Sequence, residues 1–365
     1  MKLSRTHALF RNGLLRWYSH HGRSLPWRHW RDPYRIWLRE VVLQQTRVEQ
    51  GIPYLKRLLR HYPTLKRLAH AHVDELLHLW QGLGYYSRAR HLHQAARHLY
   101  QNYGGRFPRS YEEWLALKGV GPCTAAAIVS FAFNQPFAVV DGNVCRVLAR
   151  AFGLDQSLTH HRKAFETLAQ TLLDPQQPGT FNQALMDFGA TVCTPRQPQC
   201  SSCFFRKHCV AFQQGLISDL PRQSPKVAVR TRYLVFFIFH LKGSTYITRR
   251  DAKDIYRHLF AFPWLETDGS YDFPKVRRLL QSSGWLKKVP RRLWLSSSFQ
   301  HRLSHQCLQV TFAHVPVHSS LLKVPEGWQR VPYGHLKNFA FPQFIRQYLK
   351  NYVPCEKLLA YERYE

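Results

Sequence analysis

Four cysteines within residues 193–209 constrain this chain more than any other feature. Cys193, Cys200, Cys203 and Cys209 are separated by six, two and five residues. Short gaps allow one loop to present four thiolates to a common centre without a large entropic cost of loop closure. The uneven spacing favours a [4Fe-4S] cluster. A structural zinc ion more often uses two Cys-x-x-Cys pairs, whereas here only Cys200 and Cys203 form one. Zinc and four free thiols stay open as alternatives.

The charge of the chain indicates what it binds. The 365 residues include 52 Lys and Arg against 22 Asp and Glu, a formal net charge of +30. An excess this large indicates a polyanionic partner, usually a nucleic acid. Residues 1–18 alternate basic and apolar side chains and lack the apolar centre of a signal peptide. We therefore expect a cytoplasmic, nucleoid-associated protein, whose thiols are ligands or core residues rather than disulfides.

A helix is predicted from Pro33, a residue favoured in the first turn. Apolar side chains at helical spacing continue from Ile36 to Ile52, and Glu40 falls on the same face. A carboxylate on an apolar face is costly unless it is paired or functional. A salt-bridged glutamate and a catalytic glutamate are therefore both open interpretations. The polar patch that follows, around Gln45, could contact base edges.

Two glycine-containing turns could contact DNA. Residues 82–86 place Leu83 and Tyr85 in a turn that could enter a duplex, although an ordinary interhelical turn fits as well. A capping box at residues 110–113 starts a helix, and Gly119 and Gly121 then form a turn before Pro122 opens another. Backbone N–H groups at such a helix start suit a phosphate oxygen, so this segment is either a helix–hairpin–helix DNA grip or a plain helical hairpin.

Asp141 and Asp187 are two further acidic candidates. Asp141 follows an apolar run and precedes an amphipathic helix, where a carboxylate commonly caps the helix and contributes about 1 kcal/mol. The same position could aim the carboxylate at a positive centre, and the two roles are compatible. Asp187, just before the cysteines, we expect to face solvent.

Together these stretches resemble the helix–hairpin–helix DNA glycosylases, and most closely the adenine-excising branch of that family. The matching stretches are residues 25–27, 40–46, 80–86, 119–121, 140–144 and the four cysteines. The resemblance implies a multidomain chain: an all-α glycosylase domain with a [4Fe-4S] loop, followed by an α+β Nudix-like domain. It also implies a monofunctional base excision repair enzyme that hydrolyses the N-glycosidic bond of adenine mispaired with 8-oxoguanine or guanine in double-stranded DNA.

The resemblance also implies roles for individual residues. Glu40 would be the catalytic acid and base, Asp141 would stabilise the oxocarbenium ion or bond to it, and Asn143 would orient water or a carboxylate. The DNA contacts that it implies are Gln45, Leu83, Tyr85, Gly119, Gly121, Ser304 and His305. Related lyases carry a lysine after the hairpin, whereas this chain has Cys123, so we expect no strand-cleaving lyase activity.

The expected domains are residues 1–212, a linker at 213–230, a second domain at 231–355 and a tail at 356–365. Strands are predicted at 233–239, 245–248 and 307–317. Ser304 and His305 would probe 8-oxoguanine in the Nudix-like domain, or would form an ordinary polar loop. We expect a monomer. The alternatives are an endonuclease III-like glycosylase/lyase for oxidised pyrimidines and a non-catalytic iron–sulfur DNA-binding protein.

Overall fold

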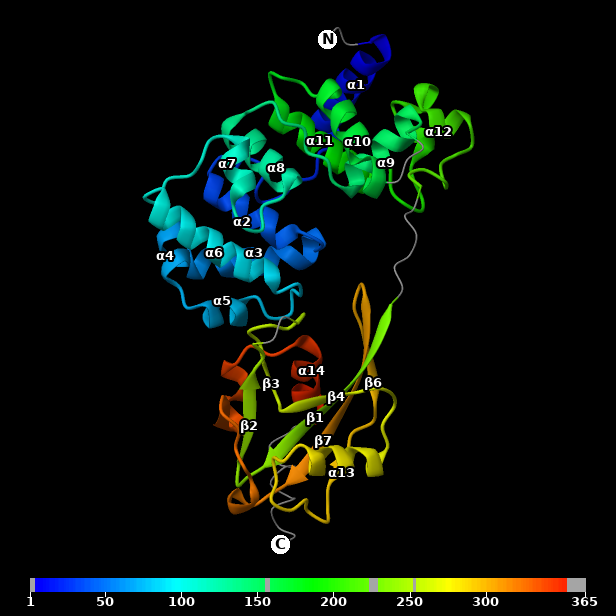
Figure 1. The fold of residues 1–365 in the computed structure, drawn as a ribbon. Coiled ribbons are helices and arrows are strands. Elements are labelled where there is room, and N and C mark those ends of the chain that lie inside the picture. Colours follow the sequence, from blue (N-terminus) through cyan, green and yellow to red (C-terminus); the bar gives the residue numbers. More distant parts are fainter. Residues whose placement is uncertain (1–3, 155–157, 223–228, 252–253, 353–365) are drawn as a thin grey trace. The chain divides into compact units, whose positions relative to one another are not determined.

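The computed structural model describes residues 4–154, 158–222, 229–251 and 254–352. The chain divides into two compact units, each described by itself below (Figure 1). The helical unit comprises Met1–His70 and His91–Pro225, and the sheet unit comprises Ala71–Arg90 and Lys226–Glu365. Part of the expected linker, residues 223–228, and the expected tail lie outside the described residues.

The helical unit is built from helices that pack around α8 (Pro122–Phe133) and α11 (Pro178–Thr191), most of whose residues are buried. Its elements are α1 (Arg5–His21), α2 (Pro33–Leu43), α3 (Val48–His61), α4 (Leu65–His70), most of α6 (Ser87–Asn102), α7 (Tyr111–Ala116), α8 (Pro122–Phe133), α9 (Gly142–Phe152), α10 (Leu158–Leu172), α11 (Pro178–Thr191), η1 (Cys200–Ser202), η2 (Arg206–His208) and α12 (Val210–Gln213). Helix α8 is apolar on all sides and packs against α2, α7 and α11, as expected for a helix buried all round. One core cluster joins α1, α9, α10 and α11 through Phe10, Leu148, Phe165 and Phe181.

Close helix packing in this unit depends on glycine at particular positions. A Cβ atom at Gly179 of α11 would lie 2.8 Å from the backbone oxygen of Ser130 on α8. A Cβ atom at Gly189 would lie 2.9 Å from Cβ and 3.0 Å from the backbone oxygen of Asn143 on α9. Helix α11 therefore approaches both α8 and α9 more closely than any other residue type at these positions would allow.

The helix predicted from Pro33 to Ile52 is wrong in its length. Helix α2 ends at Leu43, and α3 starts at Val48. Gln45 between them adopts a φ of 55°, in the left-handed region. This break could not be predicted from the residue types, because left-handed turns usually carry glycine or asparagine and residues 44–47 contain neither.

The sheet unit contains two β-sheets and two longer helices. Its elements are α5 (Val73–Leu79), β1 (Arg230–His240), β2 (Ser244–Arg249), β3 (Phe260–Ala261), β4 (Trp264–Thr267), α13 (Phe273–Ser282), β5 (Trp294–Leu295), β6 (Phe299–Arg302), β7 (Gln306–Pro316), η3 (Ser319–Leu321), β8 (Trp328–Pro332), η4 (Tyr333–Asn338) and α14 (Gln343–Tyr352). One sheet has the order β4-β1-β7-β5 with β6 paired to β7, and the other has the order β3-β2-β8. The three predicted strands are confirmed as β1, β2 and β7.

The long strands β1 and β7 run parallel and form the centre of this unit. Alternate side chains of β1 point to opposite faces. Phe237 and Phe239 pack with Val276 and Leu280 of α13. Phe236 on the other face lies 5.5 Å, centroid to centroid, from Phe344 of α14. The sheet is thus apolar on both faces, which explains why β1 reads as a continuous apolar run in the sequence.

Among the described residues, no helix is both long enough and apolar enough to cross a membrane.

Candidate active site and cysteine loop

Glu40 lies in the last turn of α2 and is largely buried. Its side chain is 13% exposed, and its carboxylate forms an ion pair with Arg39, which is 5% exposed. The backbone oxygen of Glu40 accepts a hydrogen bond from the N–H of Gln44 (3.1 Å), where the helix ends. Glu40 is therefore on the buried face, as predicted. The pairing that the sequence left as an alternative is also present.

Asp141 caps the N-terminus of α9 and is half-buried. Its Oδ1 accepts a hydrogen bond of 2.7 Å from the backbone N–H of Val144, so the predicted capping role is confirmed. Burial raises the pKa of the Asp141 carboxyl, backbone hydrogen bonds from Val144 and Asn143 partly oppose this, and the negative charge of Glu40 raises it further. The two carboxylates, about 100 residues apart in the chain, are thus close enough to interact electrostatically.

Cys123, in the first turn of α8, adjoins the same pair of carboxylates. Burial raises the pKa of its thiol to about 12, and the charges of Glu40 and Asp141 add to the effect. The side chain is therefore a neutral thiol at physiological pH and a poor nucleophile. The site brings together one residue from the end of α2, one from the start of α8 and one from the start of α9.

A buried asparagine fixes the segment that leads into Asp141. Asn182 on α11 is 1% exposed. Its Oδ1 accepts from the backbone N–H of Val139 (3.0 Å), and its Nδ2 donates to the backbone oxygen of Phe137 (2.8 Å) and to Oγ of Ser130 (3.0 Å). Sequence reasoning missed this residue, because one asparagine inside an amphipathic helix carries no signal of its long-range partners.

Asn143 is linked to the cysteine loop through Arg146. Nη2 of Arg146 donates to Oδ1 of Asn143 (2.8 Å) and to the backbone oxygen of Gly189 (2.8 Å). Nε of the same guanidinium donates to the backbone oxygen of Cys193 (2.9 Å). The predicted site residue Asn143 and the first cysteine are therefore held by the same arginine.

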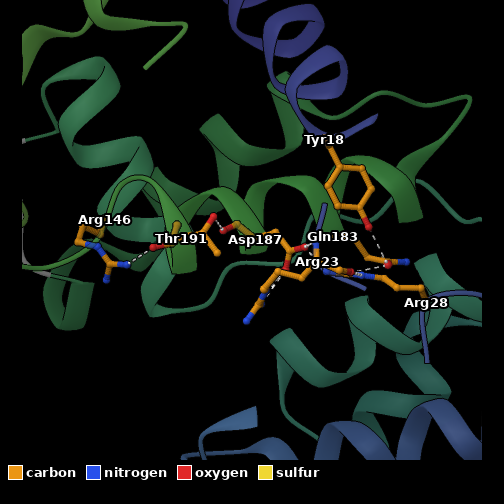
Figure 2. A network of polar contacts seen from close by, with 8 residues as sticks. Tyr18, Arg23, Arg28, Arg146, Gln183, Asp187 and Thr191 are labelled. Carbon is orange, nitrogen blue, oxygen red and sulfur yellow. Dashed lines mark hydrogen bonds and ion pairs between the residues drawn. The ribbon is translucent and has the colours of Figure 1, made fainter. Parts of the chain in front are cut away.

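Asp187 does not face solvent, and this prediction is wrong. It is 1% exposed on α11, where it binds two arginines of the loop that follows α1 (Figure 2). Arg23 donates to it from Nη2 (2.7 Å), Nε (2.9 Å) and the backbone N–H (3.0 Å), and Nη2 of Arg28 completes the pair. Nη1 of Arg28 also donates to Oε1 of Gln183 (2.8 Å), which Tyr18 contacts as well (3.3 Å). Two cations, the partly exposed Arg23 and the less exposed Arg28, balance the charge of the buried carboxylate.

The four cysteines gather around one small cavity of about 30 Å³, next to the core of α9 and α11. Burial raises the pKa of the Cys203 thiol to about 11, and the charges of the three other cysteines contribute. Burial likewise raises the pKa of Cys200 and of Cys209. A cation among these thiols would stabilise them as thiolates.

Arg150 supplies a buried positive charge at this cavity. It is 3% exposed, and its acceptors are the backbone oxygens of Thr194 (2.7 Å), Pro195 (3.0 Å) and Leu220 (3.0 Å) and the sulfur of Cys193 (3.7 Å). Neutral carbonyls leave the guanidinium charge uncompensated, whereas an anionic thiolate set would balance it. The donor set thus fits a metal group held by four thiolates. Across the described ranges, no three His, Cys, Asp or Glu side chains are placed as a ready coordination shell.

The predicted helical hairpin is present as α7, a turn and α8. Ser110 and Glu113 form the predicted capping box. Gly119 has a φ of +81°, and a Cβ atom there would lie 2.6 Å from Cβ of His91, so the turn requires glycine. Gly121 caps α8, and a Cβ atom there would meet open space. The N-terminus of α8 is thus sterically open at Gly121, as binding to a phosphate would require.

The remaining predicted DNA contacts differ in exposure. Gln45 is exposed, with a φ of 55°, and Tyr85 is 48% exposed, with a φ of 47°. Backbone strain of this kind is common at functional turns. Leu83 is only 5% exposed, so its side chain would have to leave the core to enter a duplex.

Ser304 and His305 lie in the turn between β6 and β7, and both are exposed. Oγ of Ser304 lies 3.1 Å from Nδ1 of His305. Within the sheet unit, both residues line a cavity of about 860 Å³ together with Leu83, Tyr85 and Arg257. Ser304 and His305, the predicted recognition residues, therefore line the same cavity as Leu83 and Tyr85 from the turn predicted to enter the duplex.

Comparison with known proteins agrees with this arrangement. The sequence profile of the HhH-GPD superfamily base excision DNA repair proteins matches residues 38–175. The chain is 32% identical over 311 residues to the adenine DNA glycosylase of Buchnera aphidicola subsp. Baizongia pistaciae (strain Bp), covering 84% of this chain and 85% of the relative. It is 47% identical over 216 residues to the adenine DNA glycosylase of Homo sapiens, covering 56% of this chain and 40% of the human one.

Solved structures show the same helical architecture. A thermostable thymine-DNA glycosylase matches with a TM-score of 0.55 and 33% identity over 57% of this chain and 98% of its own. A non-covalent endonuclease III–DNA complex matches with a TM-score of 0.52 over 59% of this chain and 99% of its own. At 22% identity, the second match supports the fold alone.

Proposed function

Since the chain belongs to the adenine DNA glycosylases of base excision repair, we propose that it excises adenine mispaired with 8-oxoguanine or guanine, with Glu40, Asp141 and Asn143 as its catalytic residues. The observation that carries the proposal is the pair of largely covered carboxylates, Glu40 and Asp141, which interact electrostatically with each other and with the neutral thiol of Cys123. Two carboxylates in different surroundings can divide the roles of proton donor and charge stabiliser.

The first step is extrusion of the adenine from the duplex, because the glycosidic bond is inaccessible inside the stack. Gln45 and Tyr85 are exposed and available to occupy the gap, and Leu83 would follow after a side-chain movement. Gly119 and Gly121 would hold the DNA backbone at the start of α8, where backbone N–H groups and the helix dipole favour a phosphate.

The second step is cleavage of the bond. Glu40 gives a proton to the imidazole-ring nitrogen of adenine, so that the base leaves in a neutral form. The electron pair of the glycosidic bond goes to the base, and positive charge develops on the sugar. An ionised Asp141 stabilises that charge, and its cap bond from Val144 holds the carboxylate in place.

The third step is the attack of water on the sugar. The Glu40 carboxylate takes a proton from the water molecule. The oxygen of that water molecule forms the new bond to the sugar carbon. Asn143, fixed by Arg146, would orient the water or a carboxylate. Because Cys123 is a neutral thiol with no amine, the reaction stops at the abasic site without strand cleavage.

We propose that Cys193, Cys200, Cys203 and Cys209 hold a [4Fe-4S] cluster. The uneven cysteine spacing and the buried Arg150 support a multi-thiolate anionic group. When bound, the cluster would cross-link the loop and neutralise the charge of Arg150. An absorbance spectrum with iron and sulfide analysis tests this proposal, since zinc without iron would contradict it.

We also propose that residues 231–355 form a Nudix-like domain in which Ser304 and His305 recognise 8-oxoguanine opposite the adenine. The cavity that both residues line with Tyr85 supports this role, since it combines hydrogen-bonding groups with an exposed ring. The linker at 213–230, a monomeric state and a cytoplasmic, nucleoid-associated location complete the proposal.

Incubation with duplexes that contain adenine opposite 8-oxoguanine tests the function directly. Strand cleavage only after heating in alkali supports a monofunctional glycosylase, and cleavage without alkali would indicate a lyase. Binding without any cleavage would indicate a DNA-binding protein alone.

The variant Glu40→Gln separates binding from chemistry. It should lower excision by about 10²–10⁴-fold, the usual contribution of a general acid, while duplex affinity stays unchanged. Excision close to that of the unmodified protein would remove Glu40 from the role of acid.

A further inference from the structure

Two arginines, Arg90 and Arg257, line the large cavity of the sheet unit. Both are partly exposed, and neither pairs with a carboxylate in the described ranges. Nη1 of Arg90 donates to the backbone oxygen of Arg257 (2.8 Å), so the two residues belong to one cluster. Burial and the positive charge of Arg257 lower the pKa of the Arg90 guanidinium. Two cations that repel each other in partly buried surroundings are costly without an anion to balance them.

Arg257 carries a second unmet demand. Its Nε is buried and has no hydrogen-bond partner in the part of the chain that the structure describes. Buried polar groups of folded proteins nearly always have a partner, and a missing partner is often a ligand or an ion. The next residue, His258, has a φ of 66°, in the left-handed region that residues other than glycine rarely adopt. Backbone strain of this kind is concentrated at functional sites.

Asp254 fixes the loop that carries Arg257. Its carboxylate pairs with Arg232 (3.0 Å) and Arg250 (2.6 Å), and its backbone oxygen accepts from the N–H of Arg257 (3.1 Å). Asp254 is the one carboxylate among the described residues that line the cavity, and these two arginines already balance its charge. Arg257 is therefore held in position before a ligand arrives, while its own charge stays uncompensated.

The wall of the cavity indicates which class of anion fits. A space of about 860 Å³ is much larger than a small inorganic ion needs and is of the size that holds a nucleotide. The exposed ring of Tyr85 offers a stacking face, and Ser304 and His305 supply hydrogen-bonding groups at the same cavity. Guanidinium groups bind phosphate oxygens through charge-assisted hydrogen bonds. A phosphate that is joined to a nucleobase uses both kinds of group.

We propose that Arg90 and Arg257 bind the DNA phosphate adjacent to the base that Ser304 and His305 recognise. The inference rests on the proposed recognition of 8-oxoguanine at this cavity and adds the group that fixes the strand there. Phosphate contacts set the register and orientation of a protein on a duplex, whereas base contacts read the sequence. The two arginines thus hold the strand so that the turn between β6 and β7 meets one particular base.

The test replaces one phosphate at a time by a neutral methylphosphonate in the strand that carries 8-oxoguanine. The adenine nucleotide opposite is replaced by its 2′-fluoro analogue, because the fluorine opposes positive charge on the sugar and so prevents excision during the measurement. Fluorescence anisotropy measures the affinity of each duplex. We expect the neutral group to weaken binding by about 10-fold at one of the linkages that flank 8-oxoguanine, as for the loss of a charge-assisted contact.

Arg257→Met keeps an unbranched apolar stem and removes the charge. It should weaken binding to the unmodified duplex about 10-fold and lower the slope of log K against log salt concentration by about 1. The neutral linkage should then cause no further loss in this variant. Arg257→Lys should keep part of the sensitivity, since lysine retains the charge without the planar fork.

Arg278→Met is the matched control. Arg278 is an exposed arginine on α13 of the same unit, and it does not line the cavity. This variant should lose affinity at the same linkage as the unmodified protein does. Thermal melting checks the folding of each variant. If Arg257→Met does not fold, Arg257→Gln and Arg90→Met replace it.

Three results would overturn the inference. The first is a neutral linkage that weakens a folded, charge-free variant as much as the unmodified protein, and the second is the absence of any sensitive linkage beside 8-oxoguanine. The third is Arg257-dependent binding of the mononucleotide 8-oxo-dGMP without a sensitive linkage in DNA, which would assign the site to free nucleotides. Failure of the proposed function looks different. The unmodified protein would then produce no alkali-labile site and would bind duplexes with 8-oxoguanine and with guanine equally.

Discussion

The proposed catalytic residues and the proposed recognition residues are held in opposite ways. Asp141 is half-buried at a helix N-terminus, where it accepts a hydrogen bond from the N–H of Val144, and it follows a segment fixed by the buried Asn182. Ser304 and His305 are exposed in a turn between two strands. The first arrangement holds its charges in place before DNA arrives, and the second leaves its donors accessible to water.

This difference indicates how each site uses binding energy. Stabilisation of a developing charge is most effective when the charged group needs no reorganisation during the reaction. An exposed turn that forms hydrogen bonds to a base edge gives up hydrogen bonds to water when DNA binds. Each contact therefore contributes less free energy to binding. We therefore expect large effects from small changes at the buried site and modest effects at the exposed turn.

After Glu40→Gln, the largest effect is expected for Asp141→Asn, which separates charge from capping. Asparagine caps helices as well as aspartate does, so α9 should keep its N-terminus. Excision should fall by about 10²–10³-fold, because the negative charge opposite the sugar is lost. Asp272→Asn is the control, since Asp272 caps α13 in the same way (2.8 Å to the N–H of Lys275). A similar loss in both variants would mean that capping, and not charge, is what matters.

The same variant makes a prediction about stability. Burial raises the pKa of Asp141, so the folded state binds this proton more tightly than the unfolded state does. The contribution of Asp141 to stability is therefore present below its unfolded value near 3.8 and is lost as the pH rises through its folded pKa. Asp141→Asn should be more stable than the unmodified protein at pH 7, and this gain should vanish near pH 3. Urea denaturation at both pH values measures it.

The second effect concerns the cysteine loop. Arg150→Met should weaken metal retention about 10–100-fold, the usual effect of removing a group that supports the ligands. Iron content after dialysis against a chelator measures this loss. Arg196→Met is the control, because Arg196 is exposed in the same loop. Equal retention in both variants would show that the buried charge of Arg150 does not balance the thiolates.

A third effect is expected at Asn182. Asn182→Leu removes three hydrogen bonds and leaves the N–H of Val139 and the carbonyl of Phe137 without this partner. We expect a loss of about 2 kcal/mol in the free energy of unfolding. Excision should fall as well, because the segment before Asp141 is released. A destabilised variant with an unchanged excision rate would show that the segment is fixed by other contacts.

The smallest effect is expected at the exposed turn. Ser304→Ala with His305→Ala should lower the preference for 8-oxoguanine over guanine by about 10-fold, as for the loss of one good contact to a base. Ser320→Ala with His318→Ala is the matched control, since that exposed pair makes a similar contact (2.9 Å) in the same unit. A change of more than 10³-fold would contradict the contrast between the two sites.

The sequence predicted best those features that depend on local pattern. The capping box at Ser110, the cap at Asp141 and the strand β1 each follow from residue types within a few positions, and all are present. The four closely spaced cysteines line one cavity, but no three of them are placed as a coordination shell in the described residues, so the metal-binding loop stays a prediction.

Features that depend on distant partners could not be predicted. Asp187 is polar and near a loop, so local pattern suggested exposure, but Arg23 and Arg28 reach it from more than 150 residues away. Arg39 lies beside Glu40 in the sequence, yet its burial depends on the ring of Phe131. The break at Gln45 depends on a left-handed backbone conformation, which glutamine rarely adopts and which its residue type therefore does not predict.

The glycine at position 189 has a consequence beyond close packing. Because Gly189 has no side chain, α11 can lie against Asn143. The carbonyl of Gly189 accepts a hydrogen bond from Arg146, which also donates to the backbone oxygen of Cys193. A single methyl group added there would push the two helices apart. It would disturb the Asn143 amide, which we propose orients water, and the cysteine loop, which we propose binds the cluster, in one movement. Damage to either centre could therefore originate at a residue that carries no chemistry of its own.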